Sequence, residues 1–382
     1  YWIGTLISFC GTCIQSTAQN WLVFELSHSS FILGLVGFVS FSPILFFSLF
    51  FGVLVDRINK RLLLLIAQIS FMCLAFLLAF LTQYHLVTVN MIMLISVLYG
   101  IIMSLDGPVR QAIVVELVGK NKILNAIALN SIAFHSARMI GPALAGILVA
   151  VIGIAGCFYL NAISFLGFIV ALFLIAPTPV SKNSSNNHFF EDLKEGLRFI
   201  RNNRIILILI AVSGLVSLFG FSYVILMPAI AKTMLHLDVK GYGFLMSASG
   251  IGSLLGGLCV ANLKKTHPQP IILIFSLCAF SLSLVVFSFT KTFVSSLIIL
   301  VSAGFFSLIA LAIMNSIIQE KVPDAFRGRV MSIYMLTFSG TIPFGCLLAG
   351  LLAQSFGIQS TIFWLGIICF VLLIVLSKKF LY

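Results

Sequence analysis

Charged residues are scarce in this sequence. Asp, Glu, Lys and Arg make up only 8% of its 382 residues, and just 10 residues are acidic. Hydrophobic residues supply 61% of the chain, and the mean hydropathy is +1.19. A soluble domain carries about three times this fraction of charge, so the composition excludes one. It indicates a protein whose surface faces lipid.

The apolar residues form long runs rather than short alternating segments. A helix of about 20 apolar residues crosses a bilayer, whereas the strands of a membrane barrel are shorter and alternate in polarity. We therefore predict an all-α membrane protein with about twelve spanning helices. The chain begins at Tyr1 inside its first apolar run, so we expect a short N-terminal tail to precede it. The expected spans are 1–24, 31–55, 62–82, 88–117, 123–151, 154–176, 205–235, 242–263, 269–289, 293–318, 329–354 and 358–377.

Patterns that bind metals, cofactors or nucleotides are missing from the sequence. Cys10 and Cys13 are spaced as in a redox or metal motif, but they lie within an expected span without a second cysteine pair or clustered histidines. No glycine-rich loop with a phosphate-binding lysine occurs, so we expect no ATPase within the chain. Catalytic carboxylate pairs and Ser/His/Asp arrangements are absent as well. We predict no enzyme activity, no metal and no cofactor.

Positive charge is distributed unevenly along the chain. The net charge of +12 suits a nucleic-acid partner, but most of the 22 Lys and Arg lie in alternate loops and in the C-terminal tail. Only Lys232, Lys240 and Lys291 lie in the opposite loops. This asymmetry follows the positive-inside rule and places both termini in the cytoplasm. We expect these charges to meet the lipid bilayer and not a nucleic acid.

A few polar side chains lie deep within the expected spans. Asp106 and Arg110 are four residues apart and share a helix face, so they can pair. An ionisable residue at this depth is costly, which favours a functional role; the alternative is an ion pair that only pins helices together. We expect Asp106 to carry a proton, with His135 as the second candidate unless it is a packing residue. The predicted proton and substrate pathway comprises Asp106, Arg110, His135, Arg138, Asn130, Gln15 and Asn20, of which the last two either line a cavity or join helices by hydrogen bonds.

The two halves of the chain resemble each other. A shift of 204 residues without gaps matches Gly141 with Gly345 and Gly153 with Gly357, and it also matches the segment 144–146 with 348–350. Such a repeat of six spans predicts two parallel halves. The polar segment between them contains FFEDLKEGLRFIRNNR, whose apolar stripe predicts a helix at the membrane surface. We therefore expect bundles at 1–176 and 205–382, joined by a cytoplasmic linker at 177–204.

A charged loop follows the second expected span. Gly52 to Arg61 reads GVLVDRINKR, in which Asp56 lies among the cations Arg57, Lys60 and Arg61. This spacing resembles the signature loop between the second and third helices of the major facilitator superfamily, although asparagine replaces its second glycine at position 59. We expect Asp56 to contact the start of the eleventh span, at the positive end of its helix dipole. The predicted cytoplasmic gate comprises Gly52, Asp56, Arg57, Lys60, Arg61, Arg327 and Arg329.

Further stretches support this resemblance. ARMIGPALAG, with Gly141, Pro142 and Gly146, resembles the fifth-helix kink motif of the antiporter branch. The stretches QNWLVFELSHSSFILGLVGF, DGPVRQAIVVELV and PDAFRGRVMSIY are similar to the branch of bacterial enterobactin exporters and macrolide-type efflux pumps. The resemblance implies the major facilitator fold, with twelve helices in two pseudo-symmetric six-helix bundles around a central cavity. It further implies an exporter, a drug:proton antiporter driven by the proton gradient, in the bacterial inner membrane.

The expected charges of the cavity indicate the class of cargo. If Asp106 pairs with Arg110, Arg138 remains as uncompensated positive charge. We therefore expect a small anionic or neutral amphipathic cargo, such as a catecholate siderophore, a drug-like molecule or a lipid-like metabolite. Proton-coupled uptake of a metabolite and a non-transporting membrane sensor with a degenerate transporter fold are the alternatives. We expect the protein to be a monomer.

Overall fold

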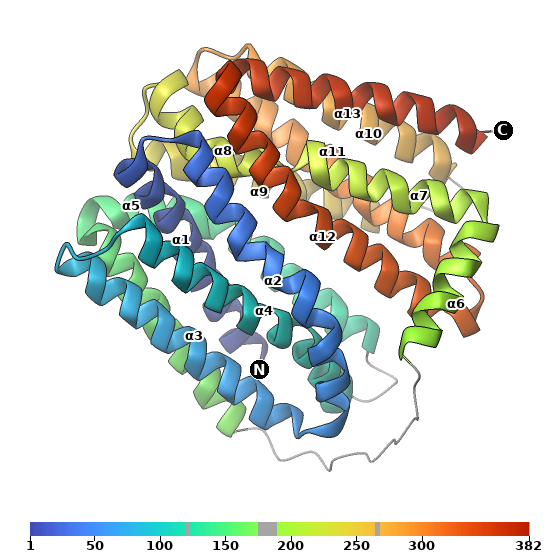
Figure 1. Ribbon diagram of the computed structural model, residues 1–382, viewed down its shortest axis with the longest axis horizontal. Helices are drawn as coiled ribbons and strands as arrows, with labels where there is room; N and C mark the ends of the chain where they lie inside the picture. The colour runs from blue at the N-terminus through green and yellow to red at the C-terminus, as the bar shows by residue number, and fades with distance from the viewer. Residues whose placement is uncertain (119–122, 175–188, 264–267, 382) are drawn as a thin grey trace.

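The computed structural model describes residues 1–118, 123–174, 189–263 and 268–381, and this part of the chain is helical with no strand (Figure 1). Its elements follow each other in the order α1 (Trp2–Ser27), α2 (Ser30–Arg57), α3 (Lys60–Gln83), α4 (Val89–Val118), α5 (Ile123–Phe173), α6 (Phe189–Asn202), α7 (Arg204–Leu215), η2 (Val216–Gly220), α8 (Tyr223–Ala229), η3 (Ile230–Met234), α9 (Val239–Ala261), α10 (Gln269–Ser288), α11 (Phe293–Lys321), α12 (Asp324–Phe356) and α13 (Ile358–Leu381).

The helices match the twelve predicted spans. Ten helices of the described chain are long and apolar enough to cross a membrane. One of these, α5, contains two spans that meet at Gly153, and α1 is a further span made less apolar by its polar stretch from Gln15 to Asn20. The seventh span is continuous from Arg204 to Met234 but changes from α- to π-helical geometry at η2 and η3. The predicted all-α fold with twelve spans is therefore confirmed.

Backbone geometry repeats between the halves. Gly153 ends the fifth span with φ 74°, and Gly357 ends α12 with φ 84°. Glycine is the residue that adopts positive φ without strain. Both glycines occupy the same place in their halves, as the repeat in the sequence predicts.

Two close contacts join the halves. One is the line of contact between α2 and α12, named the α2–α12 seam, where a Cβ added at Gly350 would lie 2.8 Å from the Cα of Gly34. In the α5–α9 seam, a Cβ added at Gly146 would lie 2.9 Å from the Cα of Lys240. Both seams lie toward the end of the molecule that is formed by the α1–α2 turn, Gly153 and Gly357, away from α6. Backbones approach this closely only where the side chains between them are small.

The end of α1 adds contacts to this junction. The Trp21 ring stacks on Tyr242 of α9 with centroids 5.7 Å apart, and the Lys232 ammonium lies 5.6 Å from the Trp21 ring. Lys232 also pairs with Glu25 at 3.7 Å. These contacts hold α1 against the second half beside the two seams.

The expected surface helix is α6, which packs on the start of α12 (Figure 1). Glu195 of α6 accepts a hydrogen bond from Arg329 at 2.6 Å. Phe199 stacks on Phe326 with centroids 4.7 Å apart. An ion pair and an aromatic pair thus attach α6 to the second half.

Candidate functional site

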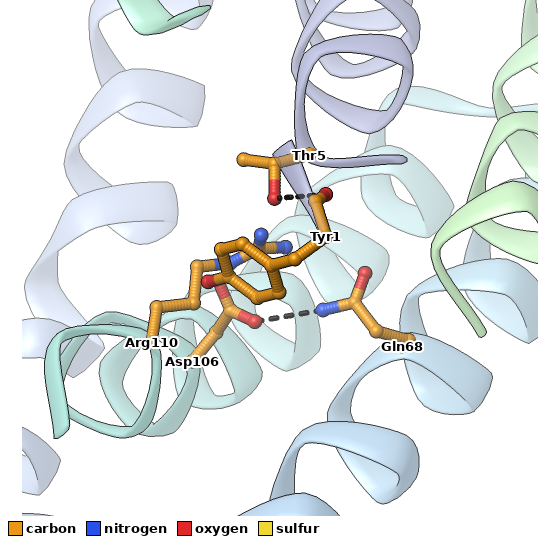
Figure 2. A network of polar contacts seen from close by, with 5 residues as sticks. All are labelled: Tyr1, Thr5, Gln68, Asp106 and Arg110. Carbon is orange, nitrogen blue, oxygen red and sulfur yellow. Dashed lines mark hydrogen bonds and ion pairs between the residues drawn. The ribbon is translucent and has the colours of Figure 1, made fainter. Parts of the chain in front are cut away.

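A buried ion pair lies within α4, flanked by a glutamine from α3. The Nε atom of Arg110 donates to Oδ2 of Asp106 at 2.5 Å, and both residues are buried, at 6% and 4% exposed. The Nε2 atom of Gln68 donates to Oδ1 of the same carboxylate at 2.7 Å. Figure 2 shows the hydrogen bond between Gln68 and Asp106, with Arg110 beside Asp106. The i, i+4 pairing that the sequence predicts is therefore present, with an additional donor from the neighbouring helix.

Aromatic rings surround the guanidinium of Arg110. Its Cζ atom lies 4.4 Å from the ring centroid of Phe168 and 5.2 Å from that of Phe9. The side chain of Tyr1 also lies beside the pair (Figure 2). Cation–π contacts of this kind stabilise a cation away from water. The Nη1 atom of Arg110 is buried and has no hydrogen-bond partner among the described residues, so it can donate to a further group.

A second cation, Arg138, lies half-buried on α5. No ion pair of Arg138 occurs within the described chain, and its guanidinium lies 5.9 Å from the Phe134 ring. Tyr223 of α8 is close enough to interact with it electrostatically, so Arg138 lies near the boundary between the halves. Nearby on α5, the Nδ1 atom of His135 and Oδ1 of Asn130 are buried without a partner among the described residues. These groups offer charge and hydrogen bonds to a bound molecule.

An aromatic pair connects the two cations. Phe9 of α1 contacts Phe134 of α5 edge-to-face, with centroids 5.7 Å apart. Arg110 lies over the first ring and Arg138 over the second. The structure thus brings the ionisable residues predicted on α4 and α5 into one cluster with α1 between them. Positive charge exceeds negative charge in this cluster.

The polar residues of α1 have different surroundings. Gln15 is buried and accepts a hydrogen bond from Nδ2 of Asn161 at 2.6 Å, which joins α1 to the sixth span. Asn20 lies beside the hydroxyl of Tyr242 in the second half. A helix-joining role is therefore visible for Gln15, whereas Asn20 lies at the junction between the halves.

The predicted gate is described only in part. The side chains of Asp56 and Arg57, and Gly52 with them, lie outside the described residues, so the predicted contact of Asp56 stays a prediction. Lys60 begins α3, and Arg61 donates through Nη2 to the carbonyl oxygen of Phe173 at 3.1 Å. On α12, Arg327 pairs with Asp324 at 2.5 Å and Arg329 pairs with Glu195 at 2.6 Å.

The glycine–proline motif packs closely in α5. A Cβ at Gly141 would lie 2.5 Å from Cβ of Cys13 on α1, and Gly146 contacts the α9 backbone. Pro142 lies within the continuous helix α5, whose one non-helical residue is Gly153. The motif therefore brings α5 close to α1 on one side and to α9 on the other.

Two site residues were missed by reasoning from the sequence. Gln68 is fully buried and bonds to Asp106, and Asn161 bonds to Gln15. Each is a lone amide within an otherwise apolar span, which is the signal that marks it. No group of three or more His, Cys, Asp or Glu that suits a metal ion occurs in the described part of the chain.

Comparison with known proteins agrees with this architecture. The family model described as "transmembrane secretion effector" matches residues 1–381. The chain is 28% identical over 373 residues to a staphyloferrin A transporter of Staphylococcus aureus, covering 96% of this chain and 92% of the relative. It is 23% identical over 374 residues to macrolide efflux protein A of Streptococcus pyogenes, covering 94% and 89%.

A solved structure shares the fold. The chain superposes with a TM-score of 0.78 on a bacterial homolog of the human lysosomal transporter Spinster, at 13% sequence identity, covering 100% of this chain and 96% of that one. The resemblance noted in the sequence is therefore confirmed, and these proteins are membrane transporters rather than enzymes. The chain belongs to the transmembrane secretion effector family of the major facilitator superfamily and is a multi-pass membrane transporter.

Proposed function

We propose that the protein is a proton-coupled exporter that moves a small anionic or neutral amphipathic molecule by alternating access. The observation that carries this proposal is the Asp106–Arg110 pair buried in α4. Ionisable groups within a membrane helix are costly to bury, and their presence there favours a functional role. A single proton can break this pair, because it converts the carboxylate into a neutral acid.

The excess of positive charge supports an anionic cargo. Asp106 compensates Arg110, whereas Arg138 has no ion pair in the described chain. A cargo carboxylate, phenolate or phosphate can pair with Arg138, and the rings of Phe9 and Phe134 can contact its apolar part. An unpaired acid would serve a cationic cargo, and Asp106 is paired. Staphyloferrin A is a suitable first probe, because one relative is a staphyloferrin A transporter.

We also propose an orientation. By the positive-inside rule, the cation-rich loops favour a cytoplasmic location in a bacterial cell for the α6 end and both termini. In this orientation the two seams join the halves at the outer end. Bundles at 1–176 and 205–382 rock about the site in this scheme, with the linker at 177–204 between them. Export is favoured for an anion, since a negative interior contributes about 2.3 kcal/mol per charge at 100 mV.

One observation favours uptake as a second candidate. Nη1 of Arg110 is buried without a partner in the described chain, so protonation of Asp106 releases a cation that is ready to bind an anion. An anion that binds there together with the proton is carried in the same direction as the proton. Export requires the cargo to bind at Arg138 while Asp106 stays deprotonated. The direction of the gradient that drives accumulation therefore separates the two functions.

Transport in vesicles tests the proposal. The purified protein is reconstituted, and uptake of radiolabelled staphyloferrin A is measured with an acidic or an alkaline lumen. Exchange for protons accumulates the cargo in the acidic lumen, and Asp106→Asn abolishes this accumulation. Accumulation in the alkaline lumen would support uptake instead. Equal accumulation in both kinds of vesicle, with wild type and Asp106→Asn alike, would refute proton coupling at this site.

A further inference from the structure

Gln68 contacts the proposed proton carrier from outside its own helix. The residue is fully buried on α3, and its Nε2 atom donates to Oδ1 of Asp106 at 2.7 Å. Its Oε1 atom is also buried and has no partner among the described residues. Leu64 and Ala67, its neighbours on α3, are buried apolar residues of the same region. The Gln68 amide thus binds Asp106 through Nε2, while its Oε1 atom makes no hydrogen bond among the described residues.

The two protonation states of Asp106 require different partners. The carboxylate accepts hydrogen bonds at both oxygens, as it does from Arg110 and Gln68. A proton added to Oδ1 turns that oxygen into a donor, which then faces the N–H of Gln68. A primary amide carries donors and an acceptor on one planar group. Rotation of the Gln68 amide by about half a turn brings Oε1 toward Oδ1 in place of Nε2.

We propose that Gln68 is a positioning residue that sets the pH at which Asp106 binds its proton. It holds the carboxylate through Nε2 and the neutral acid through Oε1. This inference rests on the proposed role of Asp106 as the proton carrier. Among the described residues, the charged and titratable groups near Asp106 are Arg110 and Tyr99 on α4 and Tyr1 before α1. The helix α3 contributes Gln68, and the Phe168 ring of α5 lies against Arg110. The helix α2, which also packs on α4, has no titratable side chain between residues 30 and 55.

A simpler role for Gln68 is to pin α3 to α4. A hydrogen bond that only joins the helices stabilises the fold equally in both protonation states of Asp106. The proposed role instead changes the equilibrium between the carboxylate and the protonated acid. Hydrogen bonds to charged groups are roughly twice as strong as those to neutral groups. Removing the Gln68 amide therefore destabilises the carboxylate form of Asp106 more than its protonated form. We expect the protonation midpoint of Asp106 to rise by about one pH unit, a tenfold change in proton affinity.

Infrared difference spectroscopy measures this midpoint without any transport. The purified protein in lipid nanodiscs is titrated, and the carboxyl C=O band of protonated Asp106 is identified by its absence in Asp106→Asn. Gln68→Met should raise the midpoint of this band and shift its frequency. The pH-dependent amide band of the Gln68 side chain should disappear in the same variant. Gln68→Asn keeps the amide but shortens the side chain by one methylene group, which withdraws the amide from Asp106. It should also raise the midpoint, and it provides a test if the first variant does not fold.

A matched control removes another glutamine that joins two helices. Gln19 of α1 donates to Ser96 of α4 at 3.1 Å and has no bond to Asp106. Gln19→Met should leave the Asp106 band and its midpoint unchanged. An unchanged midpoint and band in the Gln68 variants, or a shift of equal size in Gln19→Met, would overturn the inference.

The infrared titration and the vesicle assay fail independently. If Gln68→Met shifts the Asp106 band but Asp106→Asn keeps full gradient-driven transport, the proposed function fails and the positioning role stands. If Asp106→Asn loses coupling but Gln68→Met titrates as wild type does, the positioning role alone fails. If no band of protonated Asp106 appears in the titration, both are refuted.

Discussion

The α2–α12 seam predicts that one added methyl group shifts the protein between its conformations. In the seam, a Cβ at Gly350 would lie 2.8 Å from the Cα of Gly34 and 2.9 Å from the carbonyl oxygen of Ser30. These atoms belong to the backbone of α2, so no side chain can rotate away to make room. Gly350→Ala therefore destabilises the conformation in which the seam is closed and leaves unaffected any conformation in which the two helices separate.

The size of this shift follows from the cost of overpacking. Adding a methyl group to a closely packed contact costs about 1–3 kcal/mol. A bias of this size changes the ratio of the two conformations by about 5-fold to 150-fold. The helix itself gains up to about 1 kcal/mol from Gly→Ala in both conformations, so this gain cancels from the ratio. We expect the conformation with a separated seam to become far more populated.

Cys346 is a natural reporter of the seam. Its side chain is 6% exposed, and its Sγ atom would lie 3.0 Å from a Cβ at Gly37 on α2. A water-soluble maleimide should reach it only when α2 and α12 separate. The labelling rate of Cys346 in Gly350→Ala, resolved from the other cysteines by peptide mass spectrometry, should rise about 5-fold to 150-fold.

The same substitution elsewhere on α12 is the control. A Cβ at Gly328 would meet nothing within 4 Å among the described residues. Gly328→Ala should therefore label at Cys346 within about twofold of wild type, because surface substitutions usually change free energies by less than about 0.5 kcal/mol. Equal labelling rates in Gly350→Ala and Gly328→Ala would falsify the argument from packing.

Three further predictions concern charged residues. Asp106→Asn should abolish gradient-driven transport but retain downhill exchange, because the asparagine keeps the shape of the site without binding a proton; vesicle counterflow with and without a gradient checks both. Arg138→Gln should raise the KM of an anionic cargo at least about tenfold, since a hydrogen bond to a charged group contributes about 1.5–3 kcal/mol, whereas a change that leaves KM unaltered would remove Arg138 from the cargo site. Glu25→Gln should change the labelling of Cys346 less than about fivefold, because its pair with Lys232 is partly exposed and such pairs contribute about 0–1 kcal/mol.

Hydropathy and helical spacing predict much of the fold from the sequence alone. The spans and the pairing of Asp106 with Arg110 depend on residues close in the chain or on composition. These signals are local, because a membrane span and an i, i+4 pair are properties of one helix. The helix α6 is predicted in the same way, from the spacing of its apolar residues.

The tertiary structure alone decided which helices bring their polar groups together. Gln68 reaches Asp106 from 38 residues away, and Asn161 reaches Gln15 from 146 residues away. The sequence marks each of these amides as unusual for an apolar span, but it does not specify a partner. In lipid, helices associate through packing shape and hydrogen bonds and not through a hydrophobic pattern that can be read along the chain. Pairings between helices such as Gln68 with Asp106 therefore depend on how the helices pack, and hydropathy does not predict that packing.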